Sequence, residues 1–370
     1  MVAGMSRSPL ATVTVSAEHD YPVHIGHGAV TAIADEPALR GRRFLVVTSE
    51  SVQSIAADVC ESIGASPAGT LVVPDGETAK TVQTAADCWD AFADAGIGRG
   101  DIIVSVGGGT VTDLAGFAAA TWMRGIDVLH VPTTTAAMVD AAIGGKTGVN
   151  TRRGKNLVGS FHSPVAVYCD MDFLASLPQA DHTAGLAEAL KCGFIADSEL
   201  LRLFREHGSA LRDADHPALP EIVRRAVTVK ADVVAADFTE SASGIGRELL
   251  NYGHTFGHAL ESLHDYTLRH GDAVAMGMVL AAELSQVLGL APQAMVEEHY
   301  ELVAQLGLPA RHRVRDFGSA IELMGRDKKA RGGVIRFILL RGPGDAVAVD
   351  GVDVGDLTRA MTRCLDSEDR

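Results

Sequence analysis

The sequence has little cysteine, few aromatic residues and no long apolar run. Its five cysteines are widely spaced and form no Cys-x-x-Cys pair, which favours reduced thiols over a disulfide framework or a thiolate zinc site. Because aromatic residues make up only 5% of the chain, the core must be built mostly from alanine, valine and leucine. No apolar run could span a bilayer, and the N-terminus lacks the apolar core of a signal peptide. We therefore expect a cytoplasmic protein.

The chain also lacks excess positive charge. Its 32 basic and 47 acidic residues give a net charge of −15, which argues against nucleic acids and anionic membranes as partners. Any anion site must therefore be a local basic cluster. The length of 370 residues suits two domains.

Strand and helix patterns alternate in the first half of the sequence. This alternation predicts an α/β domain over residues 1–175, with a mostly parallel sheet covered on both faces. Long helical patterns follow and predict an all-α domain over residues 176–370, with one late strand at 335–340. The expected strands are 12–15, 23–25, 43–48, 70–73, 101–106 and 128–131, and the expected helices are 51–63, 81–95, 183–195, 219–236, 249–263, 273–288 and 292–306.

Three glycines, at 107–109, connect the strand at 101–106 to an apolar helix. Such a turn lets backbone amides approach a pyrophosphate at a helix N-terminus, although a tight packing turn is the alternative because G-x-G-x-x-G is absent. Polar residues also follow two other strands, at 74–80 and 133–135. Because the carboxyl ends of parallel strands meet at one edge of a sheet, these loops together favour a nucleotide site there.

Two glycine-rich segments carry lysines, at 142–150 around Lys146 and at 154–159 around Lys155. Glycine permits close approach of a phosphate and lysine supplies charge, so the pair predicts an anion site in two loops. Solvated surface lysines are the alternative for either segment alone. The first glycine of a Walker A motif is missing, which excludes a P-loop.

Carboxylate and histidine side chains recur in the second half. Glu188 and Lys191 lie one helical turn apart in apolar surroundings. They can form a surface ion pair, or they can be buried charges that need a partner or a metal. His254 and His258 have the i,i+4 spacing of metal ligands, and His270 opens a later helix. Spacing alone pairs His254 with His258, while ordinary hydrogen-bonded histidines are the alternative. The absence of an HExxH glutamate excludes a metalloprotease.

Several of these segments resemble one family, the 3-dehydroquinate synthases of the sugar-phosphate cyclase superfamily. They occur in the family's order and cover most of the chain. The matching segments are PDGE (74–77), SVGGGTVTDLAGFAA (105–119), PTTTAAMVDAAIGGKTGVN (132–150), GKNLVGSFHSP (154–164), GLAEALKCG (185–193), RELLNYGHTFGHALE (247–261), RHGDAVAMGM (269–278) and DKK (327–329).

The resemblance implies a Rossmann-like NAD-binding domain and a helical metal- and substrate-binding domain. It implies Zn²⁺ or Co²⁺ held by Glu188, His254 and His270, which moves His258 from the metal to the substrate phosphate. The residues implied around NAD are Asp75, Glu77, Lys80, Gly107, Gly108, Gly109, Asp113, Thr133, Thr134, Lys146, Lys155, Ser176 and Leu177. Those implied around the substrate are Asp140, Lys146, Lys155, Asn156, Lys191, Lys230, Arg247, Asn251, His258 and Lys328, with Arg124 from the second subunit of a homodimer.

The implied reaction converts 3-deoxy-D-arabino-heptulosonate 7-phosphate into 3-dehydroquinate and phosphate in the shikimate pathway of aromatic amino acid biosynthesis. The implied steps are transient NAD oxidation, phosphate elimination, re-reduction and intramolecular aldol closure. Arg247 selects this branch, because a guanidinium grips the substrate carboxylate through two parallel hydrogen bonds. The loop at 238–246 is longer than the family's usual form, and residues 48–51 lack the family's Asp and Asn near the adenosine ribose.

Three alternatives remain at this point. A cyclase of secondary metabolism, such as an amino-dehydroquinate synthase, can retain both Arg247 and Asn251. A metal-dependent polyol dehydrogenase has no need of the lysine cluster and would produce net NADH. A non-catalytic NAD-binding protein would bind no metal and release no phosphate.

Overall fold

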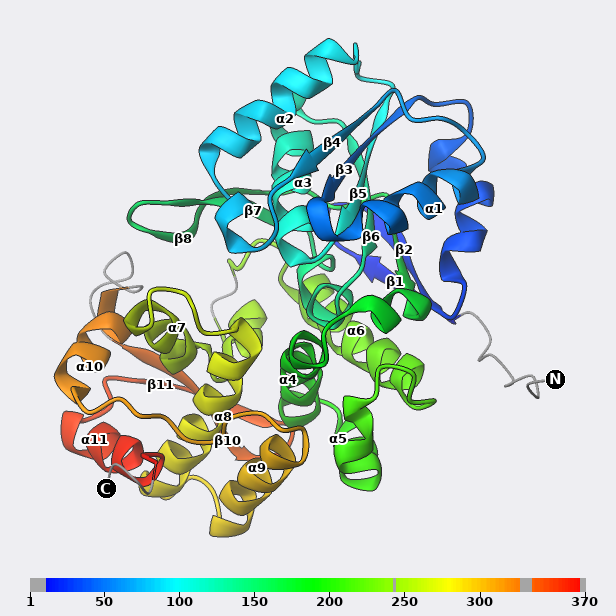
Figure 1. Cartoon of the computed structure of the whole chain (residues 1–370). Helices are drawn as coiled ribbons and strands as arrows, with labels where there is room; N and C mark the ends of the chain where they lie inside the picture. Colours follow the sequence, from blue (N-terminus) through cyan, green and yellow to red (C-terminus); the bar gives the residue numbers. More distant parts are fainter. Residues whose placement is uncertain (1–10, 242–243, 327–334, 367–370) are drawn as a thin grey trace. The chain divides into compact units, whose positions relative to one another are not determined.

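The computed structural model describes residues 11–241, 244–326 and 335–366 (Figure 1). Contacts divide the chain into two compact units. Unit 1 comprises Met1–Leu177 and Leu219–Thr239, and unit 2 comprises Pro178–Ala218 and Glu240–Arg370. None of the helices in the described ranges is long and apolar enough to cross a membrane.

Unit 1 is built on a seven-stranded sheet with the order β1-β2-β9-β6-β5-β3-β4. Neighbouring strands are parallel except for β1, which pairs antiparallel with β2 at one edge. The predicted mostly parallel sheet is therefore confirmed. Its strands are β1 (Ala11–Ser16), β2 (Asp20–Gly26), β3 (Phe44–Ser49), β4 (Gly69–Val73), β5 (Ile102–Gly107), β6 (Asp127–Pro132) and β9 (Ala166–Asp170).

Helices cover both faces of this sheet (Figure 1). Successive side chains of a strand point to opposite faces, so Leu45 and Val47 pack with α2 and α3, whereas Phe44 and Val46 pack with α1. Both faces are buried at the central strands β3 and β5, which explains why these strands read as apolar runs. The helices of unit 1 are α1 (Gln53–Ile63), α2 (Val82–Asp94), α3 (Gly109–Thr121) and α6 (Leu219–Ala236), with short helical turns η1 (Ala29–Asp35), η2 (Pro37–Leu39), η3 (Glu50–Val52), η4 (Glu77–Ala79), η5 (Trp122–Arg124), η6 (Ala137–Ala141) and η7 (Met171–Ser176).

The two glycine-rich segments expected to be loops form a hairpin instead. Strand β7 (Lys146–Thr151) pairs antiparallel with β8 (Gly154–Phe161). Glycine is needed for this pairing, because a Cβ at Gly159 would lie 2.2 Å from the Thr147 carbonyl oxygen and one at Gly148 would lie 2.8 Å from that of Val158. These glycines therefore permit close approach of two strands, a role that their density in the sequence does not reveal.

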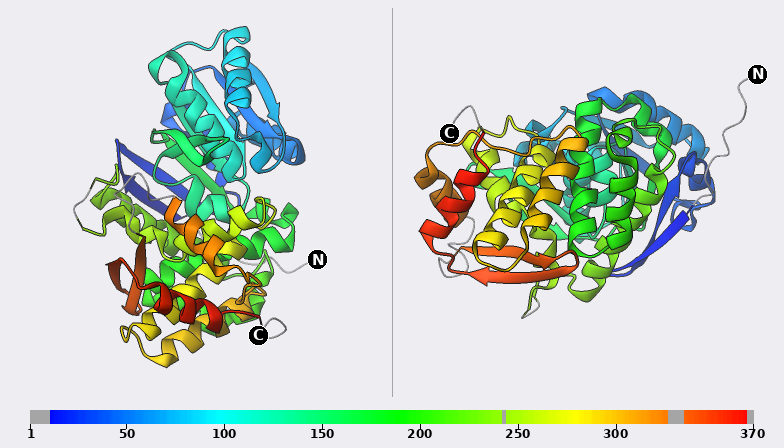
Figure 2. Two further views of the ribbon diagram at one scale, coloured as in Figure 1. Left: turned by 90° about the vertical axis from the view of Figure 1, so that its left-hand side faces the viewer. Right: turned by 90° about the horizontal axis from the view of Figure 1, so that it is seen from below.

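Unit 2 is mostly helical and carries a β-hairpin, β10 (Arg336–Gly342) with β11 (Asp345–Asp350), that packs beside the helix α8 (His270–Val287) (Figure 2). The predicted late strand is thus confirmed. The predicted helix at 249–263 is interrupted, because Gly253 adopts a left-handed φ of 80° between two shorter elements. The helices are α4 (Gln179–Ile195), α5 (Ser198–His207), η8 (Gly208–Arg212), η9 (Gly246–Asn251), α7 (His254–Leu263), α8 (His270–Val287), α9 (Gln293–Gln305), α10 (Phe317–Arg326) and α11 (Val354–Arg363).

One predicted helix falls in a different unit from the one expected. The sequence pattern placed residues 219–236 with the C-terminal helices, but α6 packs against β1, β2 and η6 of unit 1. Its helical period predicts a buried face and does not specify which unit covers that face.

Candidate active site

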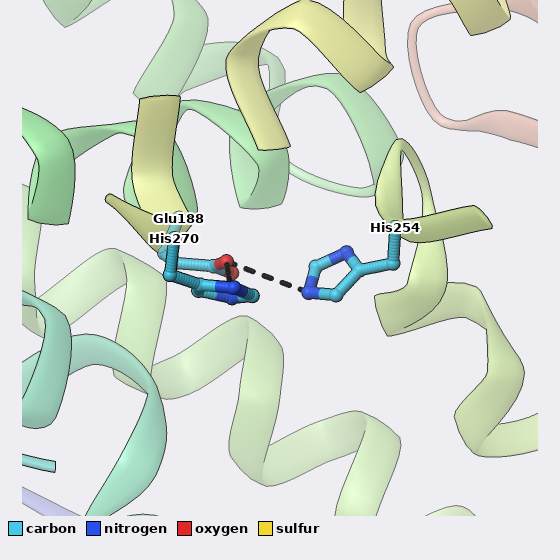
Figure 3. Close-up of side chains that lie close together, drawn as sticks. All are labelled: Glu188, His254 and His270. Carbon is cyan, nitrogen blue, oxygen red and sulfur yellow. Dashed lines mark ion pairs between the residues drawn. The ribbon is translucent and has the colours of Figure 1, made fainter. Parts of the chain in front are cut away.

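Three side chains of unit 2 converge with the geometry of a metal centre. Glu188 lies in the middle of α4, His254 begins α7 and His270 begins α8, and each offers one ligand atom within 4.8 Å of the others (Figure 3). The Oε1 atom of Glu188 lies 3.5 Å from His254 Nε2 and 3.2 Å from His270 Nε2. Ligands about 2.0–2.1 Å from a tetrahedral zinc ion stand roughly 3.3 Å apart, so these separations fit such an ion.

A buried oxygen supports the same interpretation. Glu188 Oε1 belongs to a side chain that is only 2% exposed, and among the described residues its polar neighbours are the two histidine Nε2 atoms, which form ion pairs with it when they are protonated. A buried carboxylate oxygen is costly unless a cation satisfies it, and either a protonated histidine or a metal ion can fill that role here. Exposure rises to 12% at His254 and 41% at His270, so one side of the cluster is open, as a catalytic metal site requires.

Glycines beside the histidines allow the three helices to approach so closely. A Cβ at Gly271 would lie 1.8 Å from the Ala184 carbonyl oxygen of α4, and a Cβ at Gly253 would lie 2.8 Å from Met278 of α8. A Cβ at Gly277 would in turn lie 1.9 Å from the Gly253 carbonyl oxygen. Any side chain at these positions would separate the helices that carry the ligands.

Two of the three candidate ligands are held by neighbouring groups. Lys191 forms an ion pair with Oε2 of Glu188, which leaves Oε1 facing the histidines. His254 Nδ1 lies 3.2 Å from the Tyr252 carbonyl oxygen, so that Nδ1–H can donate to it and Nε2 is left as the ligand atom. Such outer contacts fix ring orientation and tautomer at metal sites.

Burial and neighbouring charges set the protonation of the cluster. Burial acts to raise the pKa of Glu188, but Lys191 and the two histidines outweigh it and hold that pKa well below its usual value. Burial and the Lys191 ammonium lower the pKa of His254 to about 3, so its ring is neutral. Burial acts to lower the pKa of His270, but the carboxylates of Glu188 and Glu261 outweigh it and raise it to about 10. A metal must displace that proton to bind.

His258 does not belong to the group around Glu188. It forms a second possible ligand group with Glu261 and His270, and its ring centroid lies 5.3 Å from that of His254. The structure therefore separates the two histidines that spacing alone had paired. An i,i+4 spacing places two residues on one helix face, but the partners from α4 and α8 decide which of them reaches Glu188.

Two further predicted residues of unit 2 lie just before α7. Arg247 in η9 is 1% exposed. By volume it ranks first among the fully buried side chains in the described part of the chain. Asn251, at the end of η9, is exposed. Lys328 lies outside the described residues.

In unit 1, the glycine turn connects β5 directly to the N-terminus of α3. Gly107 is the last residue of β5 and Gly108 precedes α3, which no side chain caps. A Cβ at Gly107 would lie 2.6 Å from Val111 Cγ2, so this glycine allows close packing of the turn. The same turn leaves the N-terminus of α3 without a side-chain cap. The strand order reverses between β3 and β5, which is where open α/β sheets bind ligands.

A hydrogen-bond network connects four predicted residues of unit 1. The buried Lys80 donates to Asp113 Oδ2 at 2.6 Å and to Asn156 Oδ1 at 2.5 Å. Asn150 donates to Glu77 Oε1 at 2.7 Å and accepts from the Asn156 backbone amide at 3.0 Å. Burial raises the pKa of Asp113, and Lys80 opposes that rise. Asn150 was not predicted as a site residue, and only its place in the glycine-rich segment could have indicated it.

A second network joins Lys230 of α6 to Asp140 of η6. The ammonium donates to the Asp140 backbone carbonyl oxygen at 2.6 Å and forms an ion pair with its carboxylate. The Lys230 side chain is buried at 7% exposed, whereas the Asp140 side chain is 34% exposed, so the ammonium group is the desolvated member of this pair. The pairing is one of the contacts that connect α6 to η6 within unit 1.

The remaining predicted residues of unit 1 occupy varied positions. Asp75 accepts from Ser51 Oγ at 2.7 Å; burial acts to raise its pKa, but hydrogen bonds from Ser51 and Ser49 outweigh it and lower the value. Thr133 is buried, and its Oγ1 has no hydrogen-bond partner within the described ranges. The others are Thr134, which accepts from the Ala137 amide; Lys146, exposed at the start of β7; Lys155, half-buried in β8; Arg124, exposed with a φ of 72°; and Ser176 and Leu177 at the end of η7.

Solved structures of sugar-phosphate cyclases share this fold over nearly the whole chain. The structure of ValA (2-epi-5-epi-valiolone synthase) from Streptomyces hygroscopicus subsp. jinggangensis 5008, with NAD⁺ and Zn²⁺ bound, is 30% identical with a TM-score of 0.85, over 95% of this chain and 98% of that one. A 2-deoxy-scyllo-inosose synthase complexed with carbaglucose-6-phosphate, NAD⁺ and Co²⁺ is 26% identical with a TM-score of 0.85, over 96% of this chain and 100% of that one. These likenesses define the class as sugar-phosphate cyclases.

Family models narrow the class further. The model for the 3-dehydroquinate synthase N-terminal region matches residues 70–184, and that for the C-terminal region matches residues 185–330. A 3-dehydroquinate synthase from Corynebacterium efficiens is 46% identical over 354 residues, covering 94% of this chain and 96% of that protein. The chain belongs to the 3-dehydroquinate synthase family, as its sequence motifs indicated.

Proposed function

We propose that this chain is a 3-dehydroquinate synthase that uses NAD and a divalent metal. It converts 3-deoxy-D-arabino-heptulosonate 7-phosphate into 3-dehydroquinate and phosphate, as a phosphate-eliminating lyase. The observation that carries the proposal is the convergence of Glu188, His254 and His270 in a chain that matches this family along most of its length.

The donor set suits a zinc or cobalt ion. One carboxylate oxygen and two imidazole nitrogens on three helices are typical of catalytic zinc sites, and the buried Glu188 Oε1 faces both imidazole Nε2 atoms. When bound, the metal supplies polarisation of a substrate hydroxyl and NAD supplies a transient hydride acceptor. Two solved cyclases contain NAD⁺ with Zn²⁺ or Co²⁺, which supports the same pair of groups here.

Residues of unit 2 select and hold the substrate in this proposal. Arg247 binds the carboxylate, because a planar guanidinium makes two parallel hydrogen bonds to it and its burial strengthens them. Asn251 and His258 bind the phosphate that leaves. Lys191 neutralises Glu188 and donates to a substrate hydroxyl. Lys328 is proposed as a further phosphate ligand.

Residues of unit 1 bind NAD and the remaining parts of the substrate. The uncapped N-terminus of α3 at Gly108 and Gly109 favours a pyrophosphate. Thr133, which precedes Thr134 in the sequence, has a buried hydroxyl without a hydrogen-bond partner among the described residues, and we assign it to the same nucleotide. Lys80 orders Asp113 and Asn156, so the nucleotide and phosphate residues of this unit are linked by one ammonium group. Asp140 positions Lys230, the second proposed carboxylate ligand.

The other proposed NAD contacts are Asp75, Glu77, Gly107, Ser176 and Leu177, and Lys146 and Lys155 serve both substrate and cofactor. We also propose a cytoplasmic homodimer in which Arg124 reaches the partner's site. Sedimentation of the purified chain tests the dimer, and phosphate release by an Arg124→Ala variant that still sediments as a dimer tests the role of that arginine separately.

Substrate discrimination tests the proposal. Purified protein with NAD and Zn²⁺ is given either the heptulosonate phosphate or glucose 6-phosphate, and phosphate release is followed. The proposal predicts turnover of the carboxylated substrate alone, because Arg247 would otherwise be left without its anion. Turnover of glucose 6-phosphate alone would instead place the chain in a cyclase branch that acts on neutral sugars.

A further inference from the structure

We propose that Glu261 is a positioning residue that fixes the metal-binding form of His270. This inference deepens the proposed function, since it rests on the metal site assigned to Glu188, His254 and His270. Glu261 itself would touch neither metal nor substrate. It would act through the imidazole ring of His270.

The two nitrogens of His270 face two different carboxylates. Nε2 lies 3.2 Å from Glu188 Oε1, and Nδ1 lies 3.4 Å from Oε2 of Glu261. A neutral imidazole carries one proton, and donation of Nδ1–H to Glu261 leaves the Nε2 lone pair directed at the proposed metal position. A carboxylate behind a ligand histidine also increases the basicity of that ligand.

Burial and helix position make Glu261 suited to this role. Its side chain is 2% exposed and lies in α7, two turns after the ligand His254. His270 is 41% exposed and is the first residue of α8, so its ring is less enclosed than that of His254. The counterpart at His254 is the Tyr252 carbonyl oxygen, 3.2 Å from Nδ1, on a ring that is only 12% exposed. The more exposed histidine thus has the charged and stronger acceptor.

The same atoms allow one rival interpretation. His258, Glu261 and His270 could themselves bind an ion, because their ligand atoms lie within 4.8 Å of one another. With an ion already on Nε2 of His270, a second ion on Nδ1 would require the ring to lose both protons. A single ion with a protonated Nδ1 needs no such step, and it leaves His258 available for phosphate.

Substitution of Glu261, measured by metal binding as well as activity, tests the inference. The variants are Glu261→Ala and Glu261→Gln, and the control is Glu283→Gln, another carboxylate of unit 2 that is 8% exposed and accepts from Tyr300 and Arg363 at 3.2 and 3.3 Å. Zinc affinity is measured by competition with a chelator, the Co²⁺ absorption spectrum reports ligand geometry, and the Tm of the metal-free protein reports folding.

The expected result is a loss of zinc affinity by about 10–100-fold in Glu261→Ala, with an altered Co²⁺ spectrum. Glu261→Gln should lose less, because its amide oxygen can still accept from Nδ1–H. Glu283→Gln should bind zinc and give a Co²⁺ spectrum like the unsubstituted protein, whatever its Tm.

Three outcomes would overturn the inference. If Glu261→Ala keeps the original zinc affinity and spectrum while the unsubstituted chain is active, the positioning role fails and the proposed function stands. If the unsubstituted chain binds two ions and Glu261→Ala binds one, Glu261 is a ligand. If the unsubstituted chain binds no metal, the inference fails together with the metal site of the proposed function.

Discussion

Gly271 provides a test of how helix packing builds the proposed metal site. A Cβ at this position would lie 1.8 Å from the Ala184 carbonyl oxygen, and real Cβ atoms essentially never approach a neighbour closer than 3.0 Å. A Gly271→Ala substitution must therefore displace the start of α8 from α4 by at least about 1.2 Å, since the obstacle is backbone. Metal–ligand distances tolerate only about 0.2 Å. His270, the neighbouring residue, would leave the reach of an ion held by Glu188.

Two quantities follow from that displacement. Overpacking of this kind costs about 1–3 kcal/mol, which corresponds to a fall in the Tm of the metal-free protein of roughly 2–8 °C. Zinc affinity should fall more than about 100-fold, beyond the effect of losing an outer contact. Chelator competition and thermal unfolding measure the two effects. Gly342→Ala is the matched control in unit 2, because a Cβ there has no atom within 4 Å. Unchanged zinc affinity in Gly271→Ala would refute the account of how the ligands are brought together.

Three further predictions concern other parts of the molecule. Arg247→Ala should abolish turnover of the heptulosonate phosphate while leaving NAD binding nearly unchanged. Activity like that of the unsubstituted protein would contradict the substrate assignment. A double-mutant cycle of Lys80→Met and Asp113→Asn should give a coupling energy of about 0.5–3 kcal/mol in unfolding, because the two charges form a largely buried pair, and additive effects would contradict it. Burial and His162 lower the pKa of His130 to about 3, against 6.5 in the unfolded chain, so only the unfolded state gains a proton over that range. The contribution of His130 to stability should therefore be full above pH 6.5 and fall on acidification by about 1.4 kcal/mol per pH unit, and His130→Gln should reduce the slope of stability against pH by about that amount; identical slopes in a denaturant titration would exclude this origin.

The sheet of unit 1 could be predicted from the sequence for a simple physical reason. Strands buried on both faces need apolar residues at every position, and residues 44–47 and 102–104 show that pattern without interruption. The hairpin β7–β8 was not accessible, because Gly148 and Gly159 matter only across the strand pair that they allow. Local glycine density predicts a loop equally well.

The metal site shows the same limit more sharply. The spacing of His254 and His258 is a local signal, and it indicates a shared helix face. Which of the two reaches Glu188 depends on how α4, α7 and α8 approach one another, and glycines at 253, 271 and 277 control that approach. Only the family resemblance, which carries information about the assembled fold, selected His254 and His270 in advance. The sequence does not indicate roles for Glu261 and Asn150, because each role depends on a contact with a residue that is distant in the sequence or in another element, His270 and Glu77 respectively.

The stoichiometry of a single reaction tests the proposed function most directly. Purified chain with Zn²⁺, NAD and the heptulosonate phosphate is followed at once for phosphate, NADH and 3-dehydroquinate. The proposal predicts equal amounts of phosphate and 3-dehydroquinate with no accumulation of NADH, because the hydride returns in each turnover. Accumulation of NADH without phosphate would contradict it and would indicate a simple dehydrogenase.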